Sequence, residues 1–189
     1  MQFIKTREVK NPVRNVAENA GIDFYIPENT QDFYNDLLLK NQVSGFGAVA
    51  EEKDNTAVFT SKNWSYIDRA TGVIHIAPHK AIIIPTGIRS KFGPNLALIA
   101  NNKSGIATKK QLIFGASVID ASYQGEWHIN LINTSDEYQT LECGQKAVQF
   151  IPHLISTDPV EVVDMTPEEF YKDSKSSRGE GWAGSTGLK

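Results

Sequence analysis

The sequence contains almost no cysteine, since Cys143 is the single one among 189 residues. An intrachain disulfide is therefore excluded, and a lone thiol favours a reducing compartment. Residues 1–5 lack the apolar core of a signal peptide, and no run approaches the ~20 apolar residues that a membrane span requires. These absences predict a soluble protein without membrane contact, located in the cytoplasm, or in the host-cell cytoplasm if its source is viral.

The sequence also lacks an excess of basic residues. The formal net charge is −3 and the isoelectric point is about 5.8. Binding along a nucleic-acid backbone normally needs a basic patch, so direct nucleic-acid binding is not expected, whereas a single nucleotide needs only a few local cations. With 40% hydrophobic residues, the chain is long enough for one domain with a sizeable core.

Two common ligand motifs are missing as well. The four histidines, His75, His79, His128 and His153, show no spacing with Cys143 that indicates a zinc site. They are expected to be structural or surface residues. The glycine-rich C-terminal end lacks the Gly-Lys-Ser/Thr element of a Walker loop.

From about residue 72, short apolar or alternating runs are separated mostly by Gly, Pro or Asn. This pattern predicts an all-β fold, an antiparallel sandwich or barrel. The predicted strands are residues 73–77, 81–85, 96–100, 111–114, 117–120, 128–133, 147–152 and 160–163.

Residues 28–72 break this rhythm. Thr30 can cap a helix in which two aromatic residues each precede a leucine by four positions, and Gly45 or Gly47 would end it. Residues 166–169, Thr-Pro-Glu-Glu, have the spelling of a capping box with proline at the first helical position. Residues 173–189 are polar and glycine-rich, and are expected to be mobile until something binds.

Residues 117–126 carry the most informative pattern. A short β-branched run ends in Asp120, and Tyr123 follows shortly before a Gly turn, which predicts a strand entering a hairpin with an acid beside an aromatic ring. Taken alone, such a segment is more often plain architecture.

Five segments in order strengthen the functional interpretation. They are Ala20-Gly21-Ile22-Asp23-Phe24, Lys103-Ser104-Gly105-Ile106-Ala107, residues 117–126, Gly144-Gln145-Lys146-Ala147-Val148-Gln149, and residues 178–187, Arg-Gly-Glu-Gly-Trp-Ala-Gly-Ser-Thr-Gly. Together they resemble the five-motif signature of the trimeric dUTP pyrophosphatases (dUTPases). The resemblance implies a distorted jelly-roll β-barrel over residues 1–177 that forms a homotrimer with shared active sites, followed by a flexible lid arm at residues 178–189.

The interval between the first two motifs is longer than this family usually needs. Asp23 and Ser104 are separated by 104 − 23 = 81 residues. The excess, residues 30–72, resembles an insertion on the common core. Its simplest interpretation is a surface excursion packed on the barrel, because long surface insertions are thermodynamically tolerable. A regulatory partner bound there is the alternative.

The resemblance implies Mg²⁺-assisted hydrolysis of dUTP to dUMP and pyrophosphate, which limits uracil in DNA and supplies dUMP for dTTP synthesis. Asp120 would orient and deprotonate the attacking water, and an aspartate is ionised at neutral pH. Tyr123 would pack on the deoxyribose and exclude a ribose 2′-hydroxyl. Asp23 would anchor the Mg²⁺ through its water shell, since this ion keeps several waters.

The remaining motifs would bind phosphate. Ser104 and Gly105 offer a hydroxyl and backbone amides, and Lys103 stands where many relatives have Arg, so a bidentate fork becomes a point charge. Gln149 would donate to the α phosphate. Lys146 has two open interpretations, structural support through a neighbour or phosphate contact.

In the C-terminal motif, Arg178 offers a fork for the γ phosphate, and Ser185 and Thr186 offer hydroxyls beside glycines. Two positions depart from the family. Trp182 lies one place before the usual stacking aromatic, and Ser117 replaces the glycine that usually precedes Val-Ile-Asp near the uracil-reading backbone.

Two rival functions are deamination of dCTP and a non-catalytic regulatory role. The related dCTP deaminases share the fold but rely on a glutamate, and the aligned position here is Asn130. A non-catalytic module, in which the insertion binds a regulator, is disfavoured because Asp120, Tyr123 and Gln149 are all retained.

Overall fold

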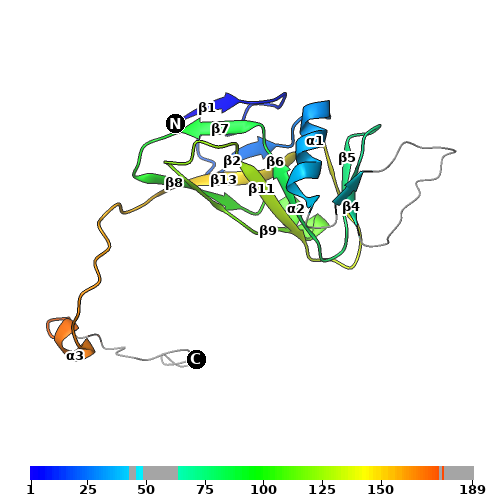
Figure 1. Cartoon of the computed structure of the whole chain (residues 1–189). Helices are drawn as coiled ribbons and strands as arrows, with labels where there is room; N and C mark the ends of the chain where they lie inside the picture. The colour runs from blue at the N-terminus through cyan, green and yellow to red at the C-terminus, as the bar shows by residue number, and fades with distance from the viewer. Residues whose placement is uncertain (43–45, 49–63, 175, 177–189) are drawn as a thin grey trace. The chain divides into compact units, whose positions relative to one another are not determined.

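The computed structural model describes residues 1–42, 46–48, 64–174 and 176, and it divides into two units, residues 1–157 and 158–189. Most of the elements are strands (Figure 1). In order they are β1 (Gln2–Lys5), β2 (Ile22–Tyr25), α1 (Gln31–Lys40), β3 (Phe46–Ala48), β4 (Ser65–Asp68), β5 (Val73–Ile76), β6 (Ala81–Pro85), β7 (Ile88–Lys91), β8 (Leu96–Asn101), α2 (Ser104–Lys110), β9 (Leu112–Phe114), β10 (Val118–Asp120), β11 (His128–Asn133), β12 (Gln139–Glu142), β13 (Lys146–Leu154) and α3 (Pro167–Phe170).

The strands of the first unit form small sheets rather than one large one. Their strand orders are β10-β8-β13-β2, β6-β11-β9, β12-β5-β4-β3 and β1-β7. Each pairing among the named strands is antiparallel except β3 with β4. The expected all-β fold class is therefore confirmed.

The core follows the period-2 alternation of the strands. β11 alternates half-buried and buried residues along its whole length, as expected for a strand with one face on the core. An aromatic cluster fills the centre, where Trp127 is wholly buried. Its ring stacks on Phe24 with centroids 5.1 Å apart and lies tilted against Phe150 with centroids 4.9 Å apart. Trp127, which directly follows the third motif, is therefore fixed in the core.

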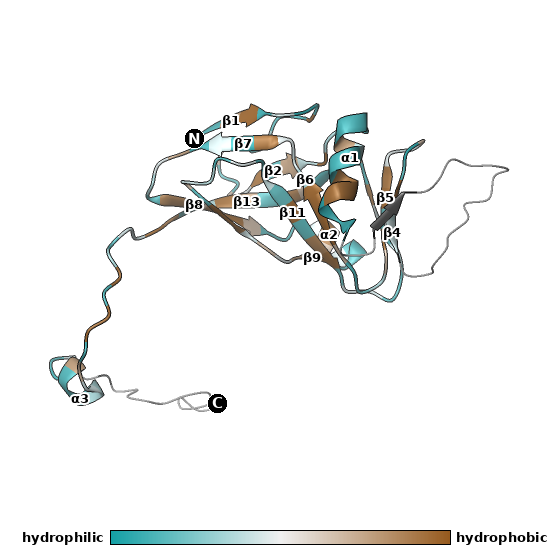
Figure 2. Ribbon diagram, in the orientation of Figure 1, coloured by the Kyte–Doolittle hydropathy of each residue, from teal (hydrophilic) through white to brown (hydrophobic). Residues whose placement is uncertain are grey.

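Helix α1 begins as predicted. The Thr30 side chain accepts a hydrogen bond from the Phe33 amide, and Phe33 and Leu37 are wholly buried. Figure 2 shows hydrophobic and hydrophilic parts alternating along α1, as expected for a helix with one buried side. The helix ends at Asn41 rather than at either predicted glycine, because the Asn41 amide binds the carbonyl of Leu37 and both main-chain groups of Ile83.

In the second unit the predicted capping box is confirmed: Thr166 and Glu169 cap each other's backbone at the start of α3. The strand predicted at residues 160–163 is wrong. These residues form no regular structure, and Val160 and Val162 are 95% and 93% exposed, so no sheet pairs with this apolar run.

Some expectations fall outside the described residues. These are the lid arm at residues 178–189 and the larger part of the insertion, residues 43–45 and 49–63. Among the helices that are described, none is both long and apolar enough to cross a membrane.

Candidate functional site

Residues 121–127 form a loop between two sheets rather than the predicted hairpin. β10 pairs with β8, placing Asp120 opposite Ala97, whereas β11 pairs with β6 and β9. We call residues 121–127 the inter-sheet loop. It carries Tyr123 away from the end of β10 and returns the chain to the core at Trp127.

A pocket of about 240 Å³ lies where β10 meets this loop. It contains both predicted residues of the third motif, Asp120 and Tyr123, together with the divergent Ser117. Its lining comprises Ala116, Ser117, Val118, Ile119, Asp120, Tyr123, His128 and Phe150. A carboxylate and an aromatic ring thus line one depression whose other lining residues are mainly apolar.

Tyr123 is held on one side and open on the other. Its hydroxyl donates to the Glu126 carbonyl at 2.9 Å, and its amide donates to the Asp120 carbonyl at 3.1 Å. A Cβ at Gly125 would lie 2.4 Å from that hydroxyl, so only glycine lets the ring fold back over the loop. The residue is still 41% exposed, which leaves surface for a ligand.

His128 also lines the pocket, a position that sequence reasoning did not anticipate. Burial lowers the pKa of its imidazole, and the charge of Lys40 lowers it further, against the opposing effect of Glu126 and Asp36. The ring is therefore neutral at neutral pH. His75 and His79 keep structural or surface positions: His75 stacks on Tyr66 and His79 pairs with Asp136 at the surface.

A second cluster surrounds Asp23, which is only 5% exposed. Its carboxylate accepts from Lys103 and from Lys146, each at 2.9 Å, and from the Asn15 amide at 3.0 Å. Burial raises the pKa of Asp23, but the hydrogen bonds and charges of the two lysines outweigh it, so the pKa lies below its usual value. Lys146 supports Asp23 in this arrangement, in agreement with the structural interpretation of that lysine.

The strand register brings three sequence motifs to this cluster. On β13, Gln149 lies opposite Asp23 of β2 and opposite Asn101 of β8. The Gln149 amide donates to the Asn102 carbonyl at 3.1 Å, and a Cβ at Gly21 would lie 2.4 Å from the Gln149 side chain. Glycine in the first motif thus makes room for the glutamine of the fourth.

The second motif continues from β8 into α2. Lys103 precedes the helix and reaches Asp23, while Ser104 begins the helix and Gly105 is exposed with open space around its Cα. The site therefore gathers Lys103, Ser104, Gly105 and Gln149 near one end of β8. Arg178, Trp182, Ser185 and Thr186 lie outside the described residues.

The two clusters occupy different ends of β8 within one chain. Asp120 pairs opposite Ala97, whereas Gln149 pairs opposite Asn101, four residues further along. At a strand rise of ~3.3 Å per residue, their backbones are separated by roughly 13 Å along the strand. One chain thus presents an acid-and-aromatic pocket and, apart from it along β8, a cationic cluster of Asp23, Lys103, Lys146 and Gln149.

The position of Asn130 bears on the choice between dUTP hydrolysis and deamination. The Asn130 side-chain oxygen accepts from the Ala116 amide at 3.2 Å, so the position aligned with the deaminase glutamate is used to tie β11 to the pocket wall. In the part of the chain that is described, no group of three or more His, Cys, Asp or Glu side chains is arranged to bind a metal by itself.

We expect Asp23→Asn to lower the free energy of unfolding by about 2 kcal/mol at pH 7, because two half-exposed ammonium groups lose their carboxylate. The folded-state pKa is depressed, so the carboxylate contributes fully above the usual aspartate pKa and loses its contribution as the pH falls through the folded value. Urea unfolding should therefore show the difference from wild type constant at pH 5–7 and shrinking below about pH 4. Asp136→Asn, at a 96% exposed side chain, is the control, and a pH-independent Asp23→Asn deficit would contradict the ion-pair assignment.

Sequence reasoning missed Arg7 and Glu126. The guanidinium of Arg7 donates two hydrogen bonds to the Glu126 carboxylate across 119 positions of sequence. The only signal available was the position of Glu126 directly after Gly125 in the third motif. Nothing in the N-terminal sequence indicates its partner.

The comparisons with known proteins agree with this arrangement. The model of the dUTPase family matches residues 69–187. The deoxyuridine 5′-triphosphate nucleotidohydrolase of Legionella pneumophila (strain Paris) is 34% identical over 119 residues, which is 60% of this chain and 72% of that protein.

Two solved phage enzymes share the fold at low sequence identity. The dUTPase of Staphylococcus bacteriophage 80alpha, solved with dUPNHPP, superposes with a TM-score of 0.67 at 18% identity, covering 99% of this chain and 98% of that one. A mutant dUTPase of the S. aureus phage phi11 gives 0.58 at 16% identity, covering 88% and 97%. The distorted jelly-roll expected from the motifs is the fold of these structures, and the family match spans well over half of the sequence: the chain belongs to the dUTPase family, a hydrolase that acts on dUTP.

Proposed function

We propose that this enzyme hydrolyses dUTP to dUMP and pyrophosphate by attack of an Asp120-activated water on the α phosphate. The observation that carries the proposal is the pocket in which Asp120 and Tyr123 meet, the acid and the aromatic wall of the third motif. In the cell this reaction would limit uracil in DNA and supply dUMP for dTTP synthesis.

In this mechanism Asp120 accepts a proton from water as the water oxygen bonds to the α phosphorus. The bond from that phosphorus to the α,β-bridging oxygen then breaks, and pyrophosphate leaves. Phosphoryl transfer of this kind depends mainly on positioning and charge neutralisation, and a positioned general base typically contributes ~10² to 10⁴ in rate. Tyr123 would lie against the deoxyribose, because its ring is fixed by Glu126 and Gly125 while one face stays open.

The cationic cluster is the proposed triphosphate site. Gln149 would donate to the α phosphate, and Lys103 with Ser104 and Gly105 would meet the phosphate oxygens. Arg178, Ser185, Thr186 and Trp182 complete the proposal as a lid: the arginine fork and hydroxyls would bind the γ phosphate, and the indole would cover the base. These four assignments rest on the fifth motif.

The residues around Asp23 fit a Mg²⁺ ion that arrives with the nucleotide. One carboxylate between two ammonium groups carries a net positive charge, which suits a triphosphate but opposes a bare cation. Asp23 would hold the ion through water, together with phosphate oxygens, once Lys103 turns to the phosphates. The bound ion would supply positive charge against the triphosphate. The related phage phi11 enzyme coordinates a structural Mg(II) ion.

A homotrimer with shared active sites is part of the proposal. The separation of the Asp120 pocket from the cationic cluster along β8 supports a shared site. The attacking water and the α-phosphate contacts must lie within a few ångströms of each other, which one chain does not provide. Residues from the Asp120 pocket of one subunit and from the cationic cluster of another would then complete one site.

Pyrophosphate release from dUTP, dCTP, dTTP and UTP, with ammonia monitored in parallel and with a chelator arm, tests this function. We expect rapid pyrophosphate release from dUTP alone, no ammonia, and loss of activity on chelation. Ammonia from dCTP would indicate a deaminase, and binding without turnover would indicate a non-catalytic module. Sedimentation velocity of the same preparation tests the shared site, which an active monomer would exclude.

A further inference from the structure

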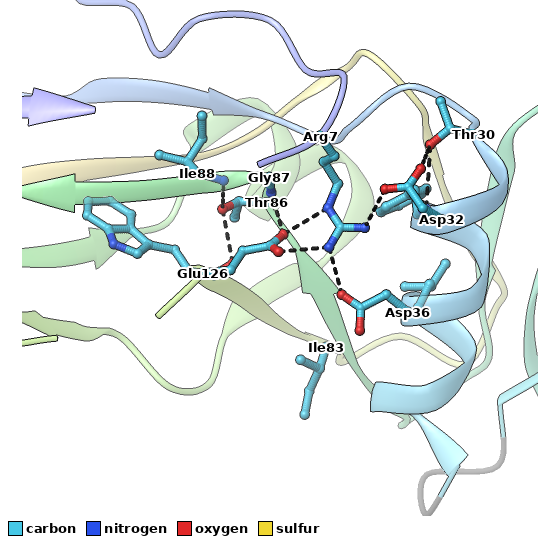
Figure 3. Close-up of polar contacts among 12 residues, drawn as sticks. Arg7, Thr30, Asp32, Asp36, Ile83, Thr86, Gly87, Ile88 and Glu126 are labelled. Atoms are coloured by element: carbon cyan, nitrogen blue, oxygen red, sulfur yellow. Dashed lines mark hydrogen bonds and ion pairs between the residues drawn. The ribbon is translucent and has the colours of Figure 1, made fainter. Parts of the chain in front are cut away.

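A largely buried arginine side chain, that of Arg7, links helix α1 to the inter-sheet loop (Figure 3). Arg7 lies two residues after the end of β1, and its side chain is 9% exposed. Its Nε donates to Oε1 of Glu126 at 3.0 Å, and its Nη2 donates to Oε2 at 2.7 Å. This two-point contact fixes the orientation of the Glu126 carboxylate as well as its position.

The other side of the guanidinium faces α1. Nη2 also donates to Asp36 at 2.8 Å, and Nη1 reaches Asp32 at 3.4 Å. Burial opposes the charge on Arg7, but the hydrogen bond and charge of Glu126, with those of Asp36 and Asp32, outweigh it and leave the pKa of Arg7 raised. One cation thus holds carboxylates from two segments that would otherwise repel each other.

The backbone around Arg7 is shaped to receive it. Gly87 donates its amide to Oε1 of Glu126 at 2.6 Å and has a φ of +71°. A Cβ at this position would lie 2.6 Å from the Arg7 side chain, so glycine is required for the contact. The cluster is therefore a built feature of the fold and not a surface ion pair.

Glu126 connects this cluster to the nucleotide pocket. Its side chain is held by Arg7, while its carbonyl accepts the Tyr123 hydroxyl at 2.9 Å. The next residue, Trp127, is wholly buried and donates its amide to Ile88 at 2.9 Å. Because Trp127 is fixed in the core, a displacement of Glu126 would move the preceding residues of the loop, which include Tyr123.

We propose that Arg7 is a positioning residue for Tyr123, which ties helix α1 to the sugar wall of the pocket through Glu126. This inference rests on the proposed function for the role of Tyr123. Asp120 is positioned independently, because β10 is paired with β8 from Val118 to Asp120. Arg7 thus sets how well deoxyribose is chosen over ribose, and the inserted helix contributes to substrate selection through its two aspartates.

The test compares kcat and KM for dUTP and UTP in wild type, Arg7→Met, Arg7→Lys, Asp36→Asn and the exposed-surface control Arg89→Met. Arg7→Met should lower the dUTP-to-UTP ratio of kcat/KM about tenfold, chiefly through KM for dUTP, because loss of the fork frees Glu126. Arg7→Lys keeps the charge but cannot make the two-point contact. Its dUTP-to-UTP ratio of kcat/KM should therefore lie between those of wild type and Arg7→Met. Asp36→Asn should lower the ratio about twofold, and Arg89→Met should leave it unchanged.

Unchanged ratios in Arg7→Met and Asp36→Asn, or equal losses for both substrates, would overturn the proposal, because a merely structural role reduces the active fraction for both alike. If Arg7→Met does not fold, Asp36→Asn decides, since it leaves the two-point contact between Arg7 and Glu126 in place. Calorimetric affinities for the α,β-imido analogues of dUTP and UTP give the same ratio without turnover. A wild type that binds but does not hydrolyse dUTP would therefore defeat the proposed function while the analogue ratio still decides the role of Arg7.

Discussion

Replacing Asp120 with asparagine should lower the turnover of dUTP by at least ~10², because the amide keeps the shape of the carboxylate but cannot accept the proton of the attacking water. Asp120 is the acid in the pocket lining, at the end of β10 and opposite Ala97. The strand pairing holds its backbone, so the substitution removes basicity with little change of geometry.

The measurement separates chemistry from binding. Single-turnover rates report the chemical step, and calorimetry with α,β-imido dUTP reports affinity, which should remain within a few-fold of wild type. Asp136→Asn, at a fully exposed surface aspartate, is the matched control. Near-normal turnover in Asp120→Asn would remove this residue from the role of base.

The sequence was most informative where periodicity and burial are local. Residues 81–85 and 128–133 are strands as predicted, because short apolar or alternating runs between turn residues are local signals. Thr30 and Thr166 cap helices as predicted because a cap involves residues only three positions apart.

The errors have non-local causes. Helix α1 ends at Asn41 because that side chain finds Ile83 on a distant strand. Residues 121–127 form an inter-sheet loop instead of a hairpin because β10 pairs with β8 rather than with β11, a choice that no short turn signal encodes. The apolar run at residues 160–163 has strand spelling but no partner strand in the described chain.

The site was predicted as a set of residues shared between subunits, but the separation of Asp120 from Gln149 along β8 within one chain was not predicted. Asp120 and Tyr123 are close in sequence and share a pocket. Asp23, Lys103 and Gln149 meet only through the register of three strands, which a single sequence does not reveal. The role of Arg7 is even harder to predict from the sequence. Its partner Glu126 lies 119 positions away, and the contact depends on Gly87 in a third segment.

The second large effect should appear in the choice between deoxyribose and ribose. An apolar wall discriminates against an added hydroxyl by ~10², whereas a polar base-reading site rejects a mismatched base by ~10⁴ or more. Wild type should therefore prefer dUTP to UTP by ~10² and dUTP to dCTP by ~10⁴ or more. Tyr123→Ala removes the wall and should bring the dUTP-to-UTP ratio of kcat/KM close to unity, while the preference over dCTP is retained.

Tyr123→Phe is the informative companion to this variant. It keeps the ring and removes only the hydroxyl that donates to the Glu126 carbonyl at 2.9 Å, so selection against UTP should weaken by about fivefold at most. In the Tyr123→Phe background, Arg7→Met should have a smaller effect than in wild type, because both changes break one path from Arg7 to the ring. Undiminished discrimination against UTP in Tyr123→Ala would mean that the ring does not face the sugar, and the ribose would then have to be excluded by another wall of the pocket.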